Sequence, residues 1–351
     1  MQKVTAEIHL GKIKENALAF SRLTGVKLCA VVKADAYGHG AEEVVSALNG
    51  VVDTFAVSLI EEGLKIRIPA CGKDILVLTP PLTTEEVYEA GVNGFVLTVS
   101  DLYTAKLIVN ACEKYNLRAR VHLKGNTGMN RYGMGISELG KTCKYLSTQK
   151  RVTVEGFYSH LYSFDRKVCE TQRQKFTKML VVCNRYFGDL TAHLSATYGA
   201  LLGKKYAFDM VRIGIGLYGY FPLKSANFEK KISLKKAMSV YAYVAKSRKY
   251  SFGGAGYGLK KLPGQQKYLS VVRFGYADGF LRKKNNGVFG FSKHANKLCM
   301  DACLRFGRLP RGKKIPLLID ADKTAKETGT ISYEVLCSAT RRAERVYYYD
   351  E

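Results

Sequence analysis

The first 222 residues alternate short apolar runs with longer stretches of helical periodicity, and this alternation constrains the fold more than any other feature. Each apolar run has the length of a buried parallel strand and is rich in Val, Ile, Leu or Phe. The eight runs are 27–34, 54–60, 74–80, 94–99, 118–124, 152–160, 191–196 and 210–216. Eight strands with intervening helices predict an α/β fold, a (β/α)8 TIM-type barrel, and the count of eight favours it over a doubly wound open sheet.

Helix-like stretches between these runs support the same interpretation. Examples are 40–50, 83–91, 100–116 and 165–187. The second stretch opens with Thr-Thr-Glu-Glu and the third with Ser-Asp, which are typical N-capping sequences.

After Pro222 the pattern changes. The segments 237–250, 267–280 and 313–322 have the character of strands and are separated by glycine-rich stretches. The sequence therefore predicts two domains, a barrel over residues 1–222 and a C-terminal all-β domain over residues 223–351.

The formal net charge of +25 is unusual and uneven. From Leu223 to the end there are 27 basic and 10 acidic residues. A basic region can bind nucleic acid, or it can attract smaller anions. Because the sequence has no RRM, KH, zinc-finger or helix-turn-helix signature, we expect no nucleic-acid partner.

No apolar run approaches the 18 residues of a membrane-spanning helix, and the N-terminus lacks the apolar core of a signal peptide. We therefore expect a cytoplasmic protein with no membrane partner. The nine cysteines include no C-x-x-C pair, which predicts reduced thiols and no metal site.

Catalytic residues of such barrels lie at the C-terminal ends of the strands. The first run ends in AVVKADAYGHG, which places Lys33 at its end and Tyr37 four residues later. A lysine that ends a buried run is either a side chain that reaches solvent or an amine with a depressed pKa, suited to forming a Schiff base.

Later strand ends favour the second interpretation. Lys124 ends the fifth run, His160 the sixth, and hydroxyls follow the seventh at Ser195 and Thr197. Arg212 lies in the eighth run, before glycines at 214 and 216. Hydroxyls and glycine N–H groups after the last two strands are typical of a phosphate site, and a phosphate site beside a strand-end lysine suits pyridoxal phosphate.

These residues resemble the alanine racemases, the fold-type III pyridoxal-phosphate enzymes. The motifs AVVKADAYGHG, NTGMNRYG, RIGIGLYG, GYADG and CMDAC occur in the family's order and span nearly the whole chain. The resemblance implies a barrel that binds pyridoxal 5'-phosphate, a β-domain that contributes to the partner's active site, and a head-to-tail homodimer with shared active sites.

The resemblance also implies a role for each matching residue. Lys33 resembles the lysine that binds the cofactor covalently and acts as one of two acid–base groups. Tyr257 resembles the opposing base, delivered by the partner subunit, although Phe252 offers a rival alignment. The remaining cofactor-binding matches are Tyr37, His160, Thr197, Arg212, Gly214 and Ile215. The substrate-binding matches are Arg131, Tyr276, Met300, Asp301 and Arg341. Lys124 resembles the lysine that some members carry as a carbamate.

Four positions depart from the family's usual pattern. Asn126 stands where an acidic residue is common, Thr197 replaces a serine, and Lys297 replaces an arginine. Arg341, in CSATRRAER, aligns with a tyrosine near the substrate, although Arg342 takes this position if the alignment slips by one. These departures concern substrate choice and rate more than fold or cofactor.

The resemblance thus predicts an amino-acid racemase (an isomerase), with interconversion of L- and D-alanine by two bases as the function, and D-alanine biosynthesis for cell-wall peptidoglycan as the role. One alternative is a racemase for another small or polar amino acid such as serine. Another is a pyridoxal-phosphate-binding protein without racemase activity, although the retention of both Lys33 and Tyr257 argues against it.

Overall fold

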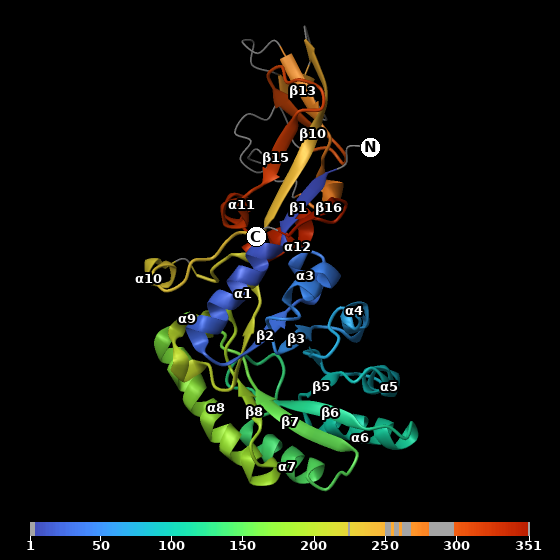
Figure 1. Ribbon diagram of the computed structural model, residues 1–351, viewed down its shortest axis with the longest axis vertical. Helices are drawn as coiled ribbons and strands as arrows, with labels where there is room; N and C mark the ends of the chain where they lie inside the picture. Colours follow the sequence, from blue (N-terminus) through green and yellow to red (C-terminus); the bar gives the residue numbers. More distant parts are fainter. Residues whose placement is uncertain are drawn as a thin grey trace. The chain divides into compact units, whose positions relative to one another are not determined.

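The computed structural model describes residues 4–223, 225–249, 254–255, 260–261, 268–280 and 298–349. The chain divides into two compact units (Figure 1). One comprises the described residues of Ile13–Ala36 and Ala41–Lys235, and the other those of Met1–Lys12, Tyr37–Gly40 and Lys236–Glu351. We call them the barrel unit and the β-unit and describe each by itself.

The barrel unit contains eight parallel strands, one for each apolar run of the sequence. They are hydrogen-bonded in the order β8-β7-β6-β5-β4-β3-β2-β9. The strands are β2 (Lys27–Val31), β3 (Thr54–Val57), β4 (Asp74–Val77), β5 (Val96–Val99), β6 (Ala119–Lys124), β7 (Val152–Tyr158), β8 (Thr191–His193) and β9 (Met210–Ile213). The prediction of a TIM-type barrel is confirmed.

Two backbone hydrogen bonds bring the ends of this sheet together. Arg212 N donates to Ser195 O at 2.9 Å, and Asp209 N donates to Ala192 O at 3.0 Å. They join β9 to β8 and its following residues, so the sheet curves into a nearly closed barrel. Every residue of β5 and β9 is buried, as the continuous apolar runs predict.

Helices alternate with the strands along the chain (Figure 1). They are α1 (Leu10–Thr24), α2 (Lys33–Tyr37), α3 (Ala41–Leu48), α4 (Ile60–Ile66), α5 (Thr84–Val92), α6 (Leu102–Lys114), α7 (Ile136–Leu146), α8 (Arg166–Phe187), α9 (Thr197–Leu202) and α10 (Ala226–Glu229), with 3-10 turns η1 (Lys204–Tyr206) and η2 (Ile215–Tyr218). The predicted caps are present, since Thr83 Oγ1 accepts from Glu86 N and Asp101 Oδ1 accepts from Thr104 N.

The β-unit is built around the long strand β10 (Met238–Lys249). It pairs antiparallel with β1 (Thr5–His9), β13 (Tyr268–Val272) and β15 (Lys314–Leu318). The sheet extends to β14 (Cys303–Phe306) and β16 (Glu344–Tyr348), and β11 (Gly254–Ala255) pairs with β12 (Lys260–Lys261). The described residues of the C-terminal part are mostly in sheet, as predicted, and they also include the helices α11 (Ala321–Thr328) and α12 (Ser332–Ala339).

The N-terminal strand β1 belongs to this C-terminal sheet. It lies between β10 and β16 and runs parallel to β16, with Thr5 opposite Glu344 and His9 opposite Tyr348 (Figure 1). The segment before the barrel therefore forms part of the β-unit's core.

The nine cysteines are free thiols. Among the described residues, no helix has both the length and the apolarity that crossing a bilayer requires.

Candidate active site

Lys33 lies just past the C-terminal end of β2, after four buried residues of that strand. The chain then adopts an unusual left-handed turn, in which Ala34, Asp35, Ala36 and Tyr37 have φ angles between 51° and 54°. Left-handed backbone costs roughly 1–2 kcal/mol per non-glycine residue, and strain of this kind gathers at functional sites. The turn fixes the direction in which the chain leaves Lys33.

Glu62 of α4 holds the start of this turn. Its Oε1 accepts a hydrogen bond from Ala34 N at 2.7 Å, and its Oε2 accepts from Ser58 N at 2.7 Å. At the other end of the turn, Asp35 Oδ1 accepts from Ala41 N at 2.8 Å. Carboxylates thus satisfy backbone donors on both sides of the strained segment.

Arg212 projects from β9 and is only 4% exposed. Its Nη1 donates to His193 Nδ1 and to His193 O, both at 2.8 Å, and its Nη2 donates to Ser159 O at 2.6 Å and Leu194 O at 3.3 Å. Because the two terminal nitrogens are engaged, Nε–H is the donor of the guanidinium that has no partner among the described residues.

A pair of buried histidines continues from Arg212. The guanidinium can only donate, so His193 Nδ1 accepts, and its proton lies on Nε2. His193 Nε2 is 2.8 Å from His122 Nδ1, which accepts that proton's hydrogen bond. Tyr158 stacks on His193, with ring centroids 4.8 Å apart. Burial lowers the pKa of His122 to about 3 and that of His193 well below its usual range, so both rings are neutral at neutral pH.

Lys124 and His160 share this positively charged environment. Lys124 is 7% exposed, and its Nζ lies 4.0 Å from the centre of the Tyr158 ring. Burial, followed by the charges of Arg212, Arg131 and Lys33, lowers the pKa of Lys124 well below its usual range. Burial and the same cations, together with Lys124, lower the pKa of His160 to about 3. Lys33, Lys124, Arg131, His160 and Arg212 therefore influence one another electrostatically, and Lys33, Arg131 and Arg212 supply positive charge suited to an anionic ligand.

Thr197 and the first residues after β9 form a cradle of backbone donors. Thr197 Oγ1 accepts from Gly214 N at 3.4 Å and from Gly216 N at 3.3 Å, and Ile215 begins η2 between them. A Cβ on Gly216 would overlap the ring of Phe20, so this approach requires glycine. Because these two hydrogen bonds are long and converge on one hydroxyl, the N–H groups that donate them can also donate to a phosphate.

The other predicted site residues belong to the β-unit. Tyr37 is buried, with its ring 5.9 Å from that of Tyr333, and burial raises its pKa. Tyr276 begins the 3-10 turn η3 (Tyr276–Asp278), and Met300 and Asp301 are exposed before β14. Tyr257, the rival Phe252 and the departure at Lys297 lie outside the described residues.

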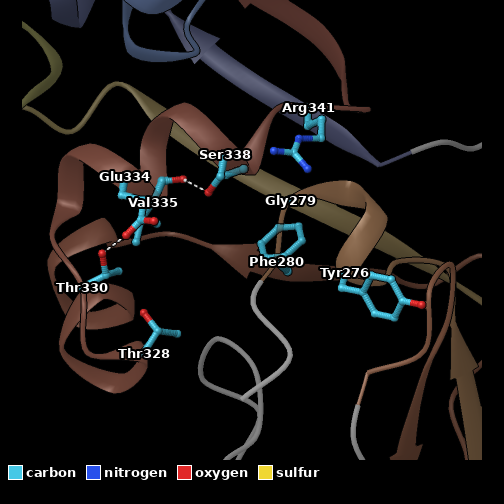
Figure 2. A pocket seen from close by; sticks show the side chains of 10 residues that line it. Tyr276, Gly279, Phe280, Thr328, Thr330, Glu334, Val335, Ser338 and Arg341 are labelled. Atoms are coloured by element: carbon cyan, nitrogen blue, oxygen red, sulfur yellow. Dashed lines mark hydrogen bonds between the residues drawn. The ribbon is translucent and has the colours of Figure 1, made fainter.

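Tyr276 and Arg341 line a cavity of about 250 Å³ against α12 (Figure 2). Phe280, Thr328, Thr330, Glu334 and Ser338 complete most of its wall. The side chain of Arg341 has no hydrogen-bond or ion-pair partner among the residues the structure describes. Arg342, the alternative at this position, instead donates from Nη1 to Asp301 Oδ1 at 2.7 Å.

Sequence reasoning missed His122, His193 and Glu62. A polar signal was present for the histidines, because each interrupts a buried apolar run. Glu62 carried no such signal, since its partner is the backbone of a turn that the sequence pattern does not predict. No group of three or more His, Cys, Asp or Glu residues in the described chain could hold a metal ion.

Comparisons with known proteins agree with this architecture. The sequence model of the alanine racemase N-terminal domain matches residues 8–222, and that of the C-terminal domain matches residues 237–347. The chain is 31% identical to the alanine racemase of Clostridium novyi, over 99% of this chain and 96% of the relative. It is 33% identical to the alanine racemase of Lactobacillus delbrueckii subsp. bulgaricus, over 97% and 96%.

Solved structures give the same result. The alanine racemase of Clostridium difficile 630 superposes with a TM-score of 0.90 at 29% identity, covering 98% of this chain and 95% of the other. A structure of that protein in complex with cycloserine superposes with a TM-score of 0.87 at 28% identity, over 98% and 95%.

Proposed function

The chain belongs to the alanine racemase family, and on that premise we propose that it interconverts L- and D-alanine with pyridoxal phosphate held at the mouth of the barrel. The observation that carries this proposal is the buried Arg212 of β9, which lies on the strand paired with β2, the strand that leads into Lys33, and just before the cradle of Thr197, Gly214 and Gly216. The relatives that match the chain over nearly its full length support alanine as the substrate.

The residues present fit this cofactor. The positive charges of Lys33, Arg131 and Arg212 match the negative charges of a phosphate ester, and Thr197 with Gly214 and Ile215 would hold the phosphate. Lys33 would form the covalent link, and Arg212 Nε–H is available for the ring nitrogen. When bound, pyridoxal phosphate supplies a carbonyl for an amine to join and a ring that withdraws electrons from Cα.

The remaining chemistry belongs to this chain's own side chains. Racemisation removes the Cα proton from one face and returns a proton on the other, so two groups on opposite faces achieve it without turning the substrate. We assign these roles to the amine of Lys33 and the phenol of Tyr257. Because an arginine retains its proton, Arg212 would keep a ring nitrogen beside it unprotonated and limit side reactions.

We further propose a cytoplasmic homodimer in which each β-unit completes the partner's site, with D-alanine supplied to peptidoglycan synthesis.

The departure at Asn126 leaves the loop beside Arg131 without the acidic residue common in the family. Lys124 would carry a carbamate, since its depressed pKa favours the neutral amine that reacts with carbon dioxide, and the product would place a negative charge among cations.

The deciding experiment replaces Lys33. We expect Lys33→Ala, purified with added pyridoxal phosphate, to lose the visible absorbance of the bound cofactor and nearly all conversion of L-alanine to D-alanine. Lys27→Ala is the matched control, because Lys27 is an exposed lysine at the opposite end of the same strand. Racemisation retained by Lys33→Ala, without an added amine, would contradict the assignment.

A further inference from the structure

Two turns of the β-unit are joined through their backbones. One is the 275–279 turn, which contains η3, and the other is the 299–302 turn before β14. Tyr276 N donates to Cys299 O and Ala277 N donates to Met300 O, both at 3.1 Å. A Cβ on Gly275 would overlap the carbonyl of Met300, so only glycine permits this approach. We call the joined pair the double turn; it carries Tyr276, Met300 and Asp301.

Each half of the double turn also supplies a carboxylate. Asp278 is 7% exposed, and its Oδ2 accepts from Gly275 N at 2.7 Å. Asp301 is exposed on the other half. Burial raises the pKa of Asp278, and the negative charge of Asp301 acts in the same direction, so the two carboxylates repel each other.

Arg342 lies beyond the end of α12 and reaches both carboxylates. Its Nη1 donates to Asp301 Oδ1 at 2.7 Å, and its Nε lies 3.7 Å from Asp278 Oδ1. One guanidinium thus offsets the repulsion between the two halves. Its neighbour Arg341 lines the cavity of Figure 2 instead, so the consecutive arginines contact different surroundings.

We propose that Arg342 is a positioning residue, which holds the double turn in the shape that receives the substrate's carboxylate and neutralises Asp301 beside it. The proposal rests on the proposed function and on the resemblance of Met300 and Asp301 to residues that contact the substrate's carboxylate in the partner's site. Without the guanidinium, the substrate's carboxylate would approach two uncompensated negative charges on a less rigid turn. The loss should therefore weaken substrate binding more than it slows the chemical step.

The first test measures the holoenzyme of Arg342→Gln. We expect KM for alanine to rise roughly threefold to fivefold, because Arg342 and Asp301 are exposed and such ion pairs contribute modestly, while kcat falls less than about twofold. The inhibition constant of propionate, a carboxylate without an amine, should rise in parallel with KM. Arg311→Gln is the matched control, because Arg311 is an exposed arginine of the same unit.

Two further variants separate positioning from a general loss of structure. Arg342→Lys retains the positive charge, so its KM for alanine should lie between those of wild type and Arg342→Gln. If Arg342→Gln does not fold, Arg342→Lys takes its place in the test. Asp278→Asn, added to Arg342→Gln, removes the repulsion and should restore part of the KM. Unchanged KM and propionate inhibition in Arg342→Gln, or a fall in kcat alone, would overturn the proposal.

Mixed dimers separate this proposal from the proposed function. When Lys33→Ala chains are mixed with Tyr257→Phe chains, each mixed dimer contains one intact site. That site combines Lys33 of the Tyr257→Phe chain with the β-unit of the Lys33→Ala chain. Arg342→Gln on the Lys33→Ala chain should raise KM, and on the Tyr257→Phe chain it should not. An equal rise from either chain overturns the role of Arg342. No activity in any mixture, despite subunit exchange, overturns the shared site, and the homodimer measurements then decide the role of Arg342.

Discussion

At the residue scale, the barrel's centre depends on three side chains that act in series. Arg212 sets the tautomer of His193, and His193 in turn donates to His122. The sequence indicated Arg212 because it lies in a strand next to glycines, but it gave no sign that two histidines from different strands meet behind it. That contact depends on the curvature of the sheet, which brings β6 and β8 side chains to within 2.8 Å of each other.

The neutral histidines predict sensitivity to acid. His122 and His160 have their pKa lowered from 6.5 to about 3, so between these values the unfolded chain binds more protons than the folded one. The free energy of unfolding should therefore fall as pH drops from about 6.5 to 3, and be fully retained above that window. The urea midpoint, measured across this range, checks the expectation.

His122→Asn tests the origin of that slope. The amide oxygen of Asn can still accept from His193, but the side chain no longer titrates. Below pH 6.5, we expect the urea midpoint of His122→Asn to decline less steeply than that of wild type. Above pH 6.5, the urea midpoints of the two proteins should change with pH in parallel. An identical decline in both proteins would assign the acid sensitivity to other groups.

Arg341 carries a prediction about substrate choice. Its guanidinium lines the cavity beside Tyr276, where the family often has a tyrosine. A donor at this place can hydrogen-bond a serine hydroxyl, which contributes roughly 0.5–1.5 kcal/mol, enough for a several-fold preference. Arg341→Tyr should therefore lower the ratio of kcat/KM for serine to that for alanine by several-fold. An unchanged ratio would make Arg341 a surface charge without a role in selection.

At the element scale, the strands and capped helices of the barrel followed from local pattern, because buried parallel strands and N-caps have local signatures. Two features of the fold did not follow from local pattern. The pairing of β1 with β16 joins residues more than three hundred positions apart, and nothing within either strand specifies the other. The left-handed turn after Lys33 contains alanines and no glycine until Gly38, so its conformation depends on partners distant in sequence, among them Glu62.

The role of Glu62 is testable. Glu62→Ala removes the acceptor for Ala34 N, so the strained turn should relax toward right-handed backbone and displace Lys33. We expect weaker retention of pyridoxal phosphate and a several-fold lower kcat. Titration of the apoenzyme with the cofactor, followed by visible absorbance, measures the first effect. Glu61→Ala, its exposed neighbour on the same helix, should behave as wild type, and equal affinity in both variants would remove Glu62 from this role.

At the scale of the whole molecule, net charge opposes assembly. Each chain carries a formal charge of +25, so two copies in the proposed homodimer repel each other. Charges separated by more than the Debye length, about 10 Å at 0.1 M salt, are largely screened. Added salt should therefore stabilise the dimer, opposite to its effect on a contact between oppositely charged surfaces.

Because the proposed site needs both chains, this repulsion predicts a dependence of activity on dilution. At nanomolar enzyme and low ionic strength, specific activity should fall as the dimer dissociates, since mass action favours single chains. Potassium chloride at about 0.3 M should restore it, because the Debye length is then well below 10 Å. At micromolar enzyme the same salt should have little effect, and sedimentation under both conditions should report the matching change in mass. Two outcomes would show that charge repulsion does not limit the active assembly. One is a specific activity that does not change on dilution at low salt. The other is a specific activity that added salt lowers in dilute samples and leaves unchanged in concentrated ones.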